Sequence, residues 1–304
     1  MTLALAPSDT TEMKSLVTYK GAQSFEILQR DHVDFTVSKR PMYLSSGIVV
    51  PNNWAVVRDD NQTTLGVVGN VYRPLQNQLG LDLFDAAAAS GQIEYGKAGT
   101  FKSGAIVWMQ IKLPGSLKVG PDEVARYLLL ANSHNGTSNL RILLTPIRVV
   151  CRNTLAMALS DKESGMKIRH TSGGSEKVKL AQRAIEDASR YYTSFQDVAN
   201  VMYRKQLTPA TIKTTIAEIF PAIGEDKEVS TRLENTRNQV IDLVERGQGQ
   251  YEIRGTAWGV YNAVAEYTDH HRSTRGDEAN RLESAWLGSG AAMKRRAFEI
   301  LTRT

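Results

Sequence analysis

The clearest indication of the fold is the stretch at residues 126–151, RYLLLANSHNGTSNLRILLTPIRVVC. Two long runs rich in aliphatic residues, 126–133 and 140–151, flank the sequence His134-Asn135-Gly136-Thr137-Ser138. Asn-Gly favours a tight turn, because both residues tolerate positive φ. The stretch therefore predicts a β-hairpin, and the choice of small polar residues at its tip follows from backbone geometry. The alternative is a loop tip that presents His134 to a ligand.

Strand patterns continue on the N-terminal side of this hairpin. Apolar and β-branched residues predict strands at 25–29, 33–37, 53–57, 64–72 and 98–114. The turn formers at 58–62 predict a second hairpin, and Gly104 marks a turn or a bulge within 98–114. One helix interrupts the strands, because Leu79, Leu83 and Ala87 fall on one helical face and Gly91 is placed to end it.

The pattern on the C-terminal side is helical, apart from a short helix predicted after Asn153 or Thr154 and a polar loop or linker at 160–176. A stripe at three- and four-residue spacing runs from Leu180 to Met202. Further helices are predicted from Thr208-Pro209 to Phe220, over 227–246, from Gly255-Thr256 to Asp269, and from a cap at Ser289 onward.

The predicted fold class is therefore α+β: a β-rich N-terminal half with one inserted helix, followed by an α-helical C-terminal half. The division we expect is a flexible segment at 1–20, a β-rich α+β core domain at 21–160, a basic linker at 161–176, and a helical domain at 177–304 packed on the core.

Composition excludes several classes of protein. The chain has 304 residues, of which 41% are hydrophobic and 23% are charged, as in soluble globular proteins. No apolar run approaches the roughly 18 residues of a membrane span, and the first residues lack the pattern of a secretion signal. A single cysteine, Cys151, excludes an intramolecular disulfide framework. We therefore expect a cytoplasmic protein without a membrane partner.

The signatures of common enzymes are missing. The chain has no phosphate-binding loop, no dinucleotide-binding glycine motif, no HExxH and no GxSxG. Cys151 is more typical of a packed thiol than of a nucleophile, and Asp269-His270-His271 is more typical of a solvated helix end than of a metal site. The sequence therefore predicts no catalytic residues, no metal and no cofactor.

The net charge of +5 is concentrated in one segment. Residues 141–183 hold nine basic and three acidic residues, whereas 1–140 are neutral and 184–304 carry a net charge of −1. Polyanion binding needs several cations on one surface, because each neutralised phosphate releases counterions. We expect phosphate contacts from six cations and base stacking by His170 or Tyr191. The six cations are Arg148, Arg152, Lys167, Arg169, Lys179 and Arg183.

Two other assignments of these cations stay open. Arg148 and Arg152 can instead be buried partners of Asp or Glu, with the rest of the segment a solvated loop. Lys294-Arg295-Arg296 is a weaker candidate for phosphate contact, because cations near a helix C-terminus also suit the helix dipole.

Several segments together resemble the phage/plasmid-like protein family, whose domain carries a label of unknown function. The segments are 72–77 (YRPLQN), 133–137 (SHNGT), 148–155 (RVVCRNTL), 169–171 (RHT), 255–267 (GTAWGVYNAVAEY), 280–281 (NR) and 284–288 (SAWLG). The resemblance extends over about residues 20–304, and Asn135 departs from it where the family pattern has Asp. It implies a protein of phages, plasmids and other mobile elements that accompanies replication and recombination genes.

The outline of a β-rich core, helices and a basic strip is also similar to that of ring-forming single-strand annealing proteins, a likeness of architecture alone. We therefore expect a non-enzymatic protein that binds DNA, in particular single strands, to protect or anneal them. We also expect a homo-oligomer with phage or host replication and recombination proteins as further partners. The alternatives are an interaction protein that binds a host factor and, behind it, a metal-dependent nuclease.

Overall fold

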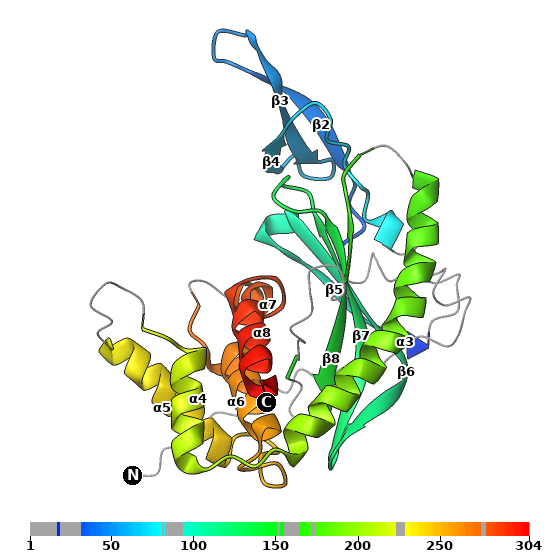
Figure 1. Cartoon of the computed structure of the whole chain (residues 1–304). Helices are drawn as coiled ribbons and strands as arrows, with labels where there is room; N and C mark the ends of the chain where they lie inside the picture. Colours follow the sequence, from blue (N-terminus) through cyan, green and yellow to red (C-terminus); the bar gives the residue numbers. More distant parts are fainter. Residues whose placement is uncertain are drawn as a thin grey trace, which may run out of the picture.

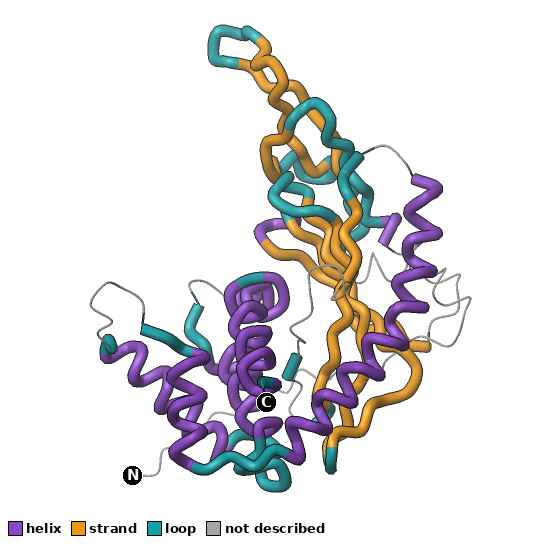
Figure 2. The backbone as a smooth tube through the Cα atoms, in the orientation of Figure 1, coloured by secondary structure: helices purple, strands orange, loops and turns teal. Residues whose placement is uncertain are grey.

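The computed structural model describes residues 17–18, 32–80, 82, 94–150, 153–154, 165–171, 174–222, 229–274 and 278–303. Two antiparallel sheets and a set of helices make up these residues (Figure 1). The small sheet extends from one end of the large sheet, and the helices lie beside the large sheet (Figure 2). The predicted α+β class is confirmed, with the strands in the N-terminal half and the helices in the C-terminal half.

The large sheet has six strands in the order β1-β5-β6-β7-β8-β9. The predicted hairpin at 126–151 forms its fourth and fifth strands, with Leu128 opposite Leu144 and Gly136 at positive φ in the turn. The segment 98–114 also forms strands, with a short 3₁₀ turn at 102–104 between them. The strands are β1 Val17–Thr18, β5 Glu94–Phe101, β6 Ile106–Val119, β7 Asp122–Ser133, β8 Leu140–Arg148 and β9 Gly165–Ile168.

The small sheet has three strands, β2 Val37–Tyr43, β3 Val49–Arg58 and β4 Thr64–Val68. The predicted hairpin around 58–62 joins β3 and β4. The small sheet rests on the turn between β7 and β8, where Gly66 lies against the backbone of Asn135. A Cβ at Gly66 would approach the Asn135 Cα to 2.6 Å, so this close contact requires glycine.

Helix α3 lies along one face of the large sheet and contacts β6, β8 and β9. The remaining helices pack against one another, and α7 also contacts β5. Thr208, Ser230 and Thr256 accept hydrogen bonds from the first turns of α4, α5 and α6, as N-cap residues do. The helices are α3 Gly174–Arg204, α4 Pro209–Ile219, α5 Thr231–Arg246, α6 Ala257–Glu266, α7 Glu278–Leu287 and α8 Ser289–Thr302, with a π-helical turn at Tyr267–His271 after α6.

Four sequence predictions of local structure were wrong. Residues 165–168 form strand β9, although 160–176 were predicted as a loop or linker. Residues 33–36 precede β2 and are not a strand. Helix α7 was not predicted, and Gly288 rather than Ser289 is the N-cap of α8. The predictions for 1–16, 25–29, 155–160 and most of the inserted helix lie outside the described residues.

One contiguous cluster of buried apolar side chains connects both sheets with the helices. It extends from Val56 in the small sheet through Leu128 in the large sheet to Trp258 in α6. The small sheet is therefore held in a defined position relative to the large one.

Candidate nucleic-acid interface

Arg148 is buried at the end of β8 and does not face solvent. Its side chain is 1% exposed, and its Nε and Nη2 donate to the Asp122 carboxylate at 2.7 and 2.6 Å. The guanidinium also donates to the backbone carbonyls of Gln248 and Gly249, and Trp258 Nε1 donates to the same carboxylate. The buried-partner alternative therefore holds for Arg148, and the prediction that it contacts phosphate is corrected. The bidentate ion pair joins β7 to β8, and the hydrogen bonds to Gln248, Gly249 and Trp258 connect it to the helical half.

The two side chains expected to stack on bases are buried as well. Tyr191 packs edge-on against Tyr192 and parallel to Phe195 in the core between α3 and the sheet. His170 is buried and stacks on Tyr72, with ring centroids 4.7 Å apart. Both rings serve packing in this conformation, so the stacking role predicted for them is corrected.

Lys167 and Arg169 lie on the opposite side of β9 from His170. Both side chains are exposed, while Ile168 and His170 are buried, which is the alternation of a strand with one covered face. Lys167 is directly opposite Arg141 of β8 in the antiparallel pair. Like charges directly opposite each other on neighbouring strands repel, because their Cβ atoms are only about 5 Å apart.

Arg73 approaches the same segment from the loop that follows β4. Its backbone N–H donates to the carbonyl of His170 at 2.8 Å, which places the chain at Arg73 beside the chain at Arg169. Lys39 of β2 and Arg73 share two acceptors, the carbonyls of Asn70 and Tyr72. Burial and the neighbouring Arg73 charge both lower the pKa of Lys39. Lys39 Nζ also lies 5.1 Å from the centre of the Trp54 ring.

Five cations from four separate segments, namely β2, the loop after β4, β8 and the β9 segment, meet where the small sheet joins the large one. We call Lys39, Arg73, Arg141, Lys167 and Arg169 the basic strip. Within the part of the chain that the structure describes, Lys39, Arg73, Arg141 and Arg169 take part in no ion pair. Cations without local countercharge create a positive potential that attracts anions. The arrangement can therefore bind a polyanion.

Sequence reasoning missed Lys39, Arg73 and Arg141 as site residues. Arg141 was counted in the basic segment, and its place one strand from β9 is set by a pairing that a loop prediction at 160–176 could not show. Arg73 belongs to the segment YRPLQN, which the family resemblance had already singled out. No sequence signal pointed to Lys39.

Three predicted site residues stay untested. Arg152 lies outside the described residues, and α3 carries the backbone of Lys179 and Arg183, whose side chains are also outside them. Their contacts with phosphate remain predictions.

The turn between β7 and β8 has the geometric role expected of it. Asn135 Oδ1 accepts from the backbone and hydroxyl of Thr137 and from the Ser133 hydroxyl. His134 is buried under this turn, where its Nε2 lies 2.9 Å from Asn77 Oδ1. Burial, with a smaller effect of His170, lowers the pKa of His134 to about 3, so the ring is neutral at physiological pH.

A second buried ion pair lies between α8 and the turn after α6. Lys294 Nζ donates to Asp269 Oδ1 at 2.7 Å and to the Thr154 hydroxyl, and Thr154 donates twice to Asp269 Oδ2. The expectation that Asp269 belongs to a solvated helix end was therefore wrong, because its carboxylate is buried and paired. Among the described residues, no group of three or more His, Cys, Asp or Glu is arranged to hold a metal ion.

The fold and the basic strip define a two-sheet α+β protein with a cationic surface at the junction of its sheets. The chain belongs to the family Domain of unknown function (DUF932), which it matches over residues 64–286. The match begins at β4 and ends within α7, so β2, β3 and α8 lie outside it. Neither the curated proteins nor the solved structures contain a match. None of the helices that the structure describes has the length and apolarity needed to cross a membrane.

Proposed function

We propose that this protein binds nucleic acid along the basic strip, and single-stranded DNA in particular. The observation that carries the proposal is the convergence of five cations from four chain segments; four of the five cations have no carboxylate partner within the described residues. Arg141 and Lys167 even face each other directly, an arrangement that an anion between them would stabilise.

The setting we propose is that of a phage, plasmid or other mobile element, in the cytoplasm of its bacterial host. The family resemblance supports it. In such a setting the protein would hold single strands for protection or annealing without changing them chemically. A role in contacting phage or host proteins is the second candidate function, and the exposed apolar surfaces of the molecule favour it.

The test compares two triple variants that lose the same charge. Lys39→Gln/Arg73→Gln/Arg169→Gln removes three cations of the basic strip. Arg246→Gln/Arg254→Gln/Arg303→Gln removes three exposed cations that pair with Asp242, Glu245 and Glu218 in the helical half. Fluorescence anisotropy with labelled single- and double-stranded oligonucleotides, at several salt concentrations, measures the dissociation constants.

We expect the strip variant to bind single strands at least tenfold more weakly at low salt. The slope of log K against log salt should fall by about 0.7 for each lost phosphate contact. The control variant should bind as the unmodified protein does. Equal losses in both variants, or no binding of the unmodified protein at micromolar concentration in low salt, would contradict the proposal.

A further inference from the structure

Tyr72, His170 and Trp54 lie beside the basic strip, but each of these rings already contacts another side chain. Tyr72 and His170 stack on each other, and Lys39 Nζ lies over the ring of Trp54. Tyr191 is buried in the core. Proteins that bind single strands combine cations for the phosphates with aromatic side chains on which the bases stack. Nucleotides held by the basic strip therefore need a stacking surface elsewhere on the molecule.

Such a surface lies at the tip of the hairpin of β2 and β3, which extends beyond the small sheet (Figure 1). Strand β4 ends opposite Trp54 of β3, and we call residues 42–53, which lie beyond this point, the arm. The Leu44 N–H donates to the Ile48 carbonyl at 2.8 Å and closes the turn of the arm. Clustered exposure of apolar side chains marks an interaction surface. Four large side chains at the tip are more than half exposed, namely Tyr43 (60%), Leu44, Ile48 and Val49.

The arm contains no charged residue, whereas its base belongs to the basic strip through Lys39 of β2. Four residue steps of an extended strand, from Lys39 to Tyr43, span about 13 Å. This length equals about four stacked nucleotides at a rise of about 3.4 Å each. A strand whose phosphate contacts Lys39 therefore passes within reach of the tip. Because the tip cannot neutralise phosphates, the part of the strand that it fits is the apolar faces of the bases.

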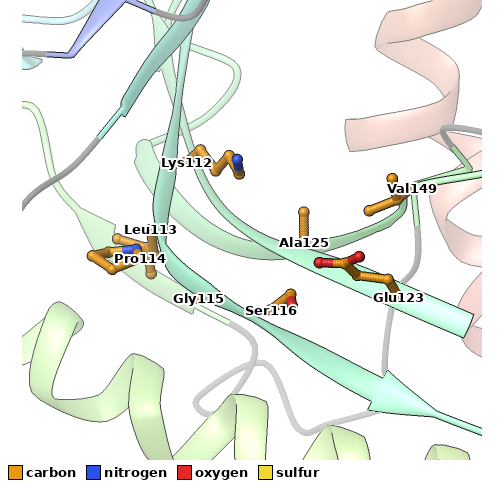
Figure 3. Close-up of a pocket in the computed structure, with 8 residues that line it drawn as sticks. All are labelled: Lys112, Leu113, Pro114, Gly115, Ser116, Glu123, Ala125 and Val149. Carbon is orange, nitrogen blue, oxygen red and sulfur yellow. The ribbon is translucent and has the colours of Figure 1, made fainter.

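A hollow of about 300 Å³ lies at the bulge of β6, at the other end of β7 from the small sheet (Figure 3). The described residues that line it include no aromatic ring, and they include Glu123. A hydrogen bond from Ser116 and the charges of Lys118 and Lys112 lower the pKa of the Glu123 carboxyl. The carboxylate is therefore ionised and repels phosphates, so the hollow does not supply the missing stacking surface.

We propose that the arm tip stacks against bases of the strand whose phosphates the basic strip holds. Tyr43 provides an aromatic face for a base, and Leu44 and Ile48 provide apolar contacts beside it, as apolar side chains inserted between bases do. The inference rests on the proposed nucleic-acid binding and adds a second kind of contact to it. Because the arm has no cation, its contribution to affinity should not depend on salt.

The test uses a variant of the tip and a matched control. Tyr43→Ala/Ile48→Ser removes the ring and one aliphatic side chain from the arm. Tyr251→Ala/Val201→Ser makes the same changes at Tyr251 (86% exposed), between α5 and α6, and at Val201 (55%), on α3. Fluorescence anisotropy at several salt concentrations measures the binding of two single-stranded oligonucleotides of equal length. One is ordinary DNA, and in the other the sugars carry no bases.

We expect the arm variant to bind the ordinary oligonucleotide at least about fivefold more weakly than the unmodified protein. The slope of log K against log salt should stay the same, because no phosphate contact is lost. The abasic oligonucleotide should bind the arm variant and the unmodified protein equally, which also shows that the variant is folded. Tyr43→Phe keeps the ring and should bind both oligonucleotides as the unmodified protein does, and so should the control.

The possible failures are distinguishable. An unmodified protein that binds neither oligonucleotide overturns both this proposal and the proposed function. An arm variant that binds the ordinary oligonucleotide as tightly as the unmodified protein overturns only the base contact. An equal loss of affinity for both oligonucleotides also overturns it, because the tip would then not act through bases. If the arm variant keeps its affinity for DNA but loses a self-association that the unmodified protein shows in sedimentation velocity, the tip is a protein surface instead.

Discussion

Arg148 and Arg169 belong to the same basic segment of the sequence, yet they have different surroundings. The Arg148 guanidinium is enclosed by Asp122 and two backbone carbonyls at the end of β8. The Arg169 side chain is exposed just after β9 and makes no ion pair within the described residues. The two side chains differ in the face of the sheet on which they lie. Arg148 lies on the buried face at the end of β8, and Arg169 lies on the exposed face just after β9. The role of a cation in a sheet is therefore decided by the face it occupies, which a count of charges along the chain does not show.

Replacement of Arg148 should have the largest effect on stability. Arg148→Ala leaves the Asp122 carboxylate buried without a cation, and we expect a loss of about 3–5 kcal/mol in the free energy of unfolding. Urea denaturation measures this loss. Arg169→Ala should change the same quantity by less than about 0.5 kcal/mol. Similar losses of unfolding free energy in Arg148→Ala and Arg169→Ala would contradict the conclusion that only Arg148 has a structural role.

A double variant tests the cause of this loss. Arg148→Met/Asp122→Leu removes both charges, so it should be more stable than Arg148→Ala alone. The recovery should be incomplete, because Trp258 Nε1 loses its acceptor as well.

Lys294 and Arg295 allow the same comparison between neighbours. Lys294 is buried against Asp269, whereas Arg295 is exposed on α8. Lys294→Ala should cost about 3 kcal/mol of unfolding free energy, because it strands the Asp269 carboxylate, and Arg295→Ala should cost less than about 0.5 kcal/mol. Urea denaturation again provides the measurement. A Lys294 variant as stable as the Arg295 variant would show that the buried pair contributes nothing to folding.

His134 tests whether burial without an ion pair also sets the behaviour of a titratable group. Its pKa is lowered from 6.5 to about 3 by burial, so the folded ring stays neutral while the unfolded ring takes up a proton below pH 6.5. The free energy of unfolding should therefore decrease as the pH is lowered, by roughly 1.4 kcal/mol per pH unit between pH 6.5 and pH 3. His134→Gln keeps a donor for Asn77 and should lack this slope.

The measurement is urea denaturation of both proteins at pH 6.5, 5.5 and 4.5. Carboxylates common to the two proteins cancel in the difference, which isolates the contribution of His134. Parallel stability curves for the two proteins would contradict the neutral buried ring.

Much of the fold follows from local patterns. The Asn-Gly turn between two apolar runs predicts β7 and β8, and Thr208-Pro209 predicts the start of α4, because in both places the backbone geometry is set by neighbouring residues. Strand β9 was missed because its four residues are too few to show a period, and its position depends on pairing with β8.

The basic strip was less predictable from the sequence, because it too depends on contacts between segments far apart in the chain. Strand alternation explains why Lys167 and Arg169 are exposed and why His170 is not, but only once β9 is known to be a strand. Lys39 and Arg73 are brought to β9 by contacts between segments far apart in the chain, and no local pattern contains such contacts. Charge position along the sequence located one side of the basic strip and missed the other.

Arg141→Glu, the variant that we expect to raise stability slightly, separates binding from folding most sharply. It places a carboxylate directly opposite Lys167, so repulsion across the strand pair becomes attraction. We expect the folded state to gain about 0.2–1 kcal/mol, as opposite-charge pairs across strands do. Binding of a single-stranded oligonucleotide should weaken at the same time, because the strip loses one cation and gains an anion. Arg141→Gln should fall between the two proteins in both urea denaturation and anisotropy. If Arg141→Glu instead lowers stability and leaves binding unchanged, Arg141 is a structural residue like Arg148. The face of β8 and β9 that carries Arg141 and Lys167 would then not be the nucleic-acid-binding surface.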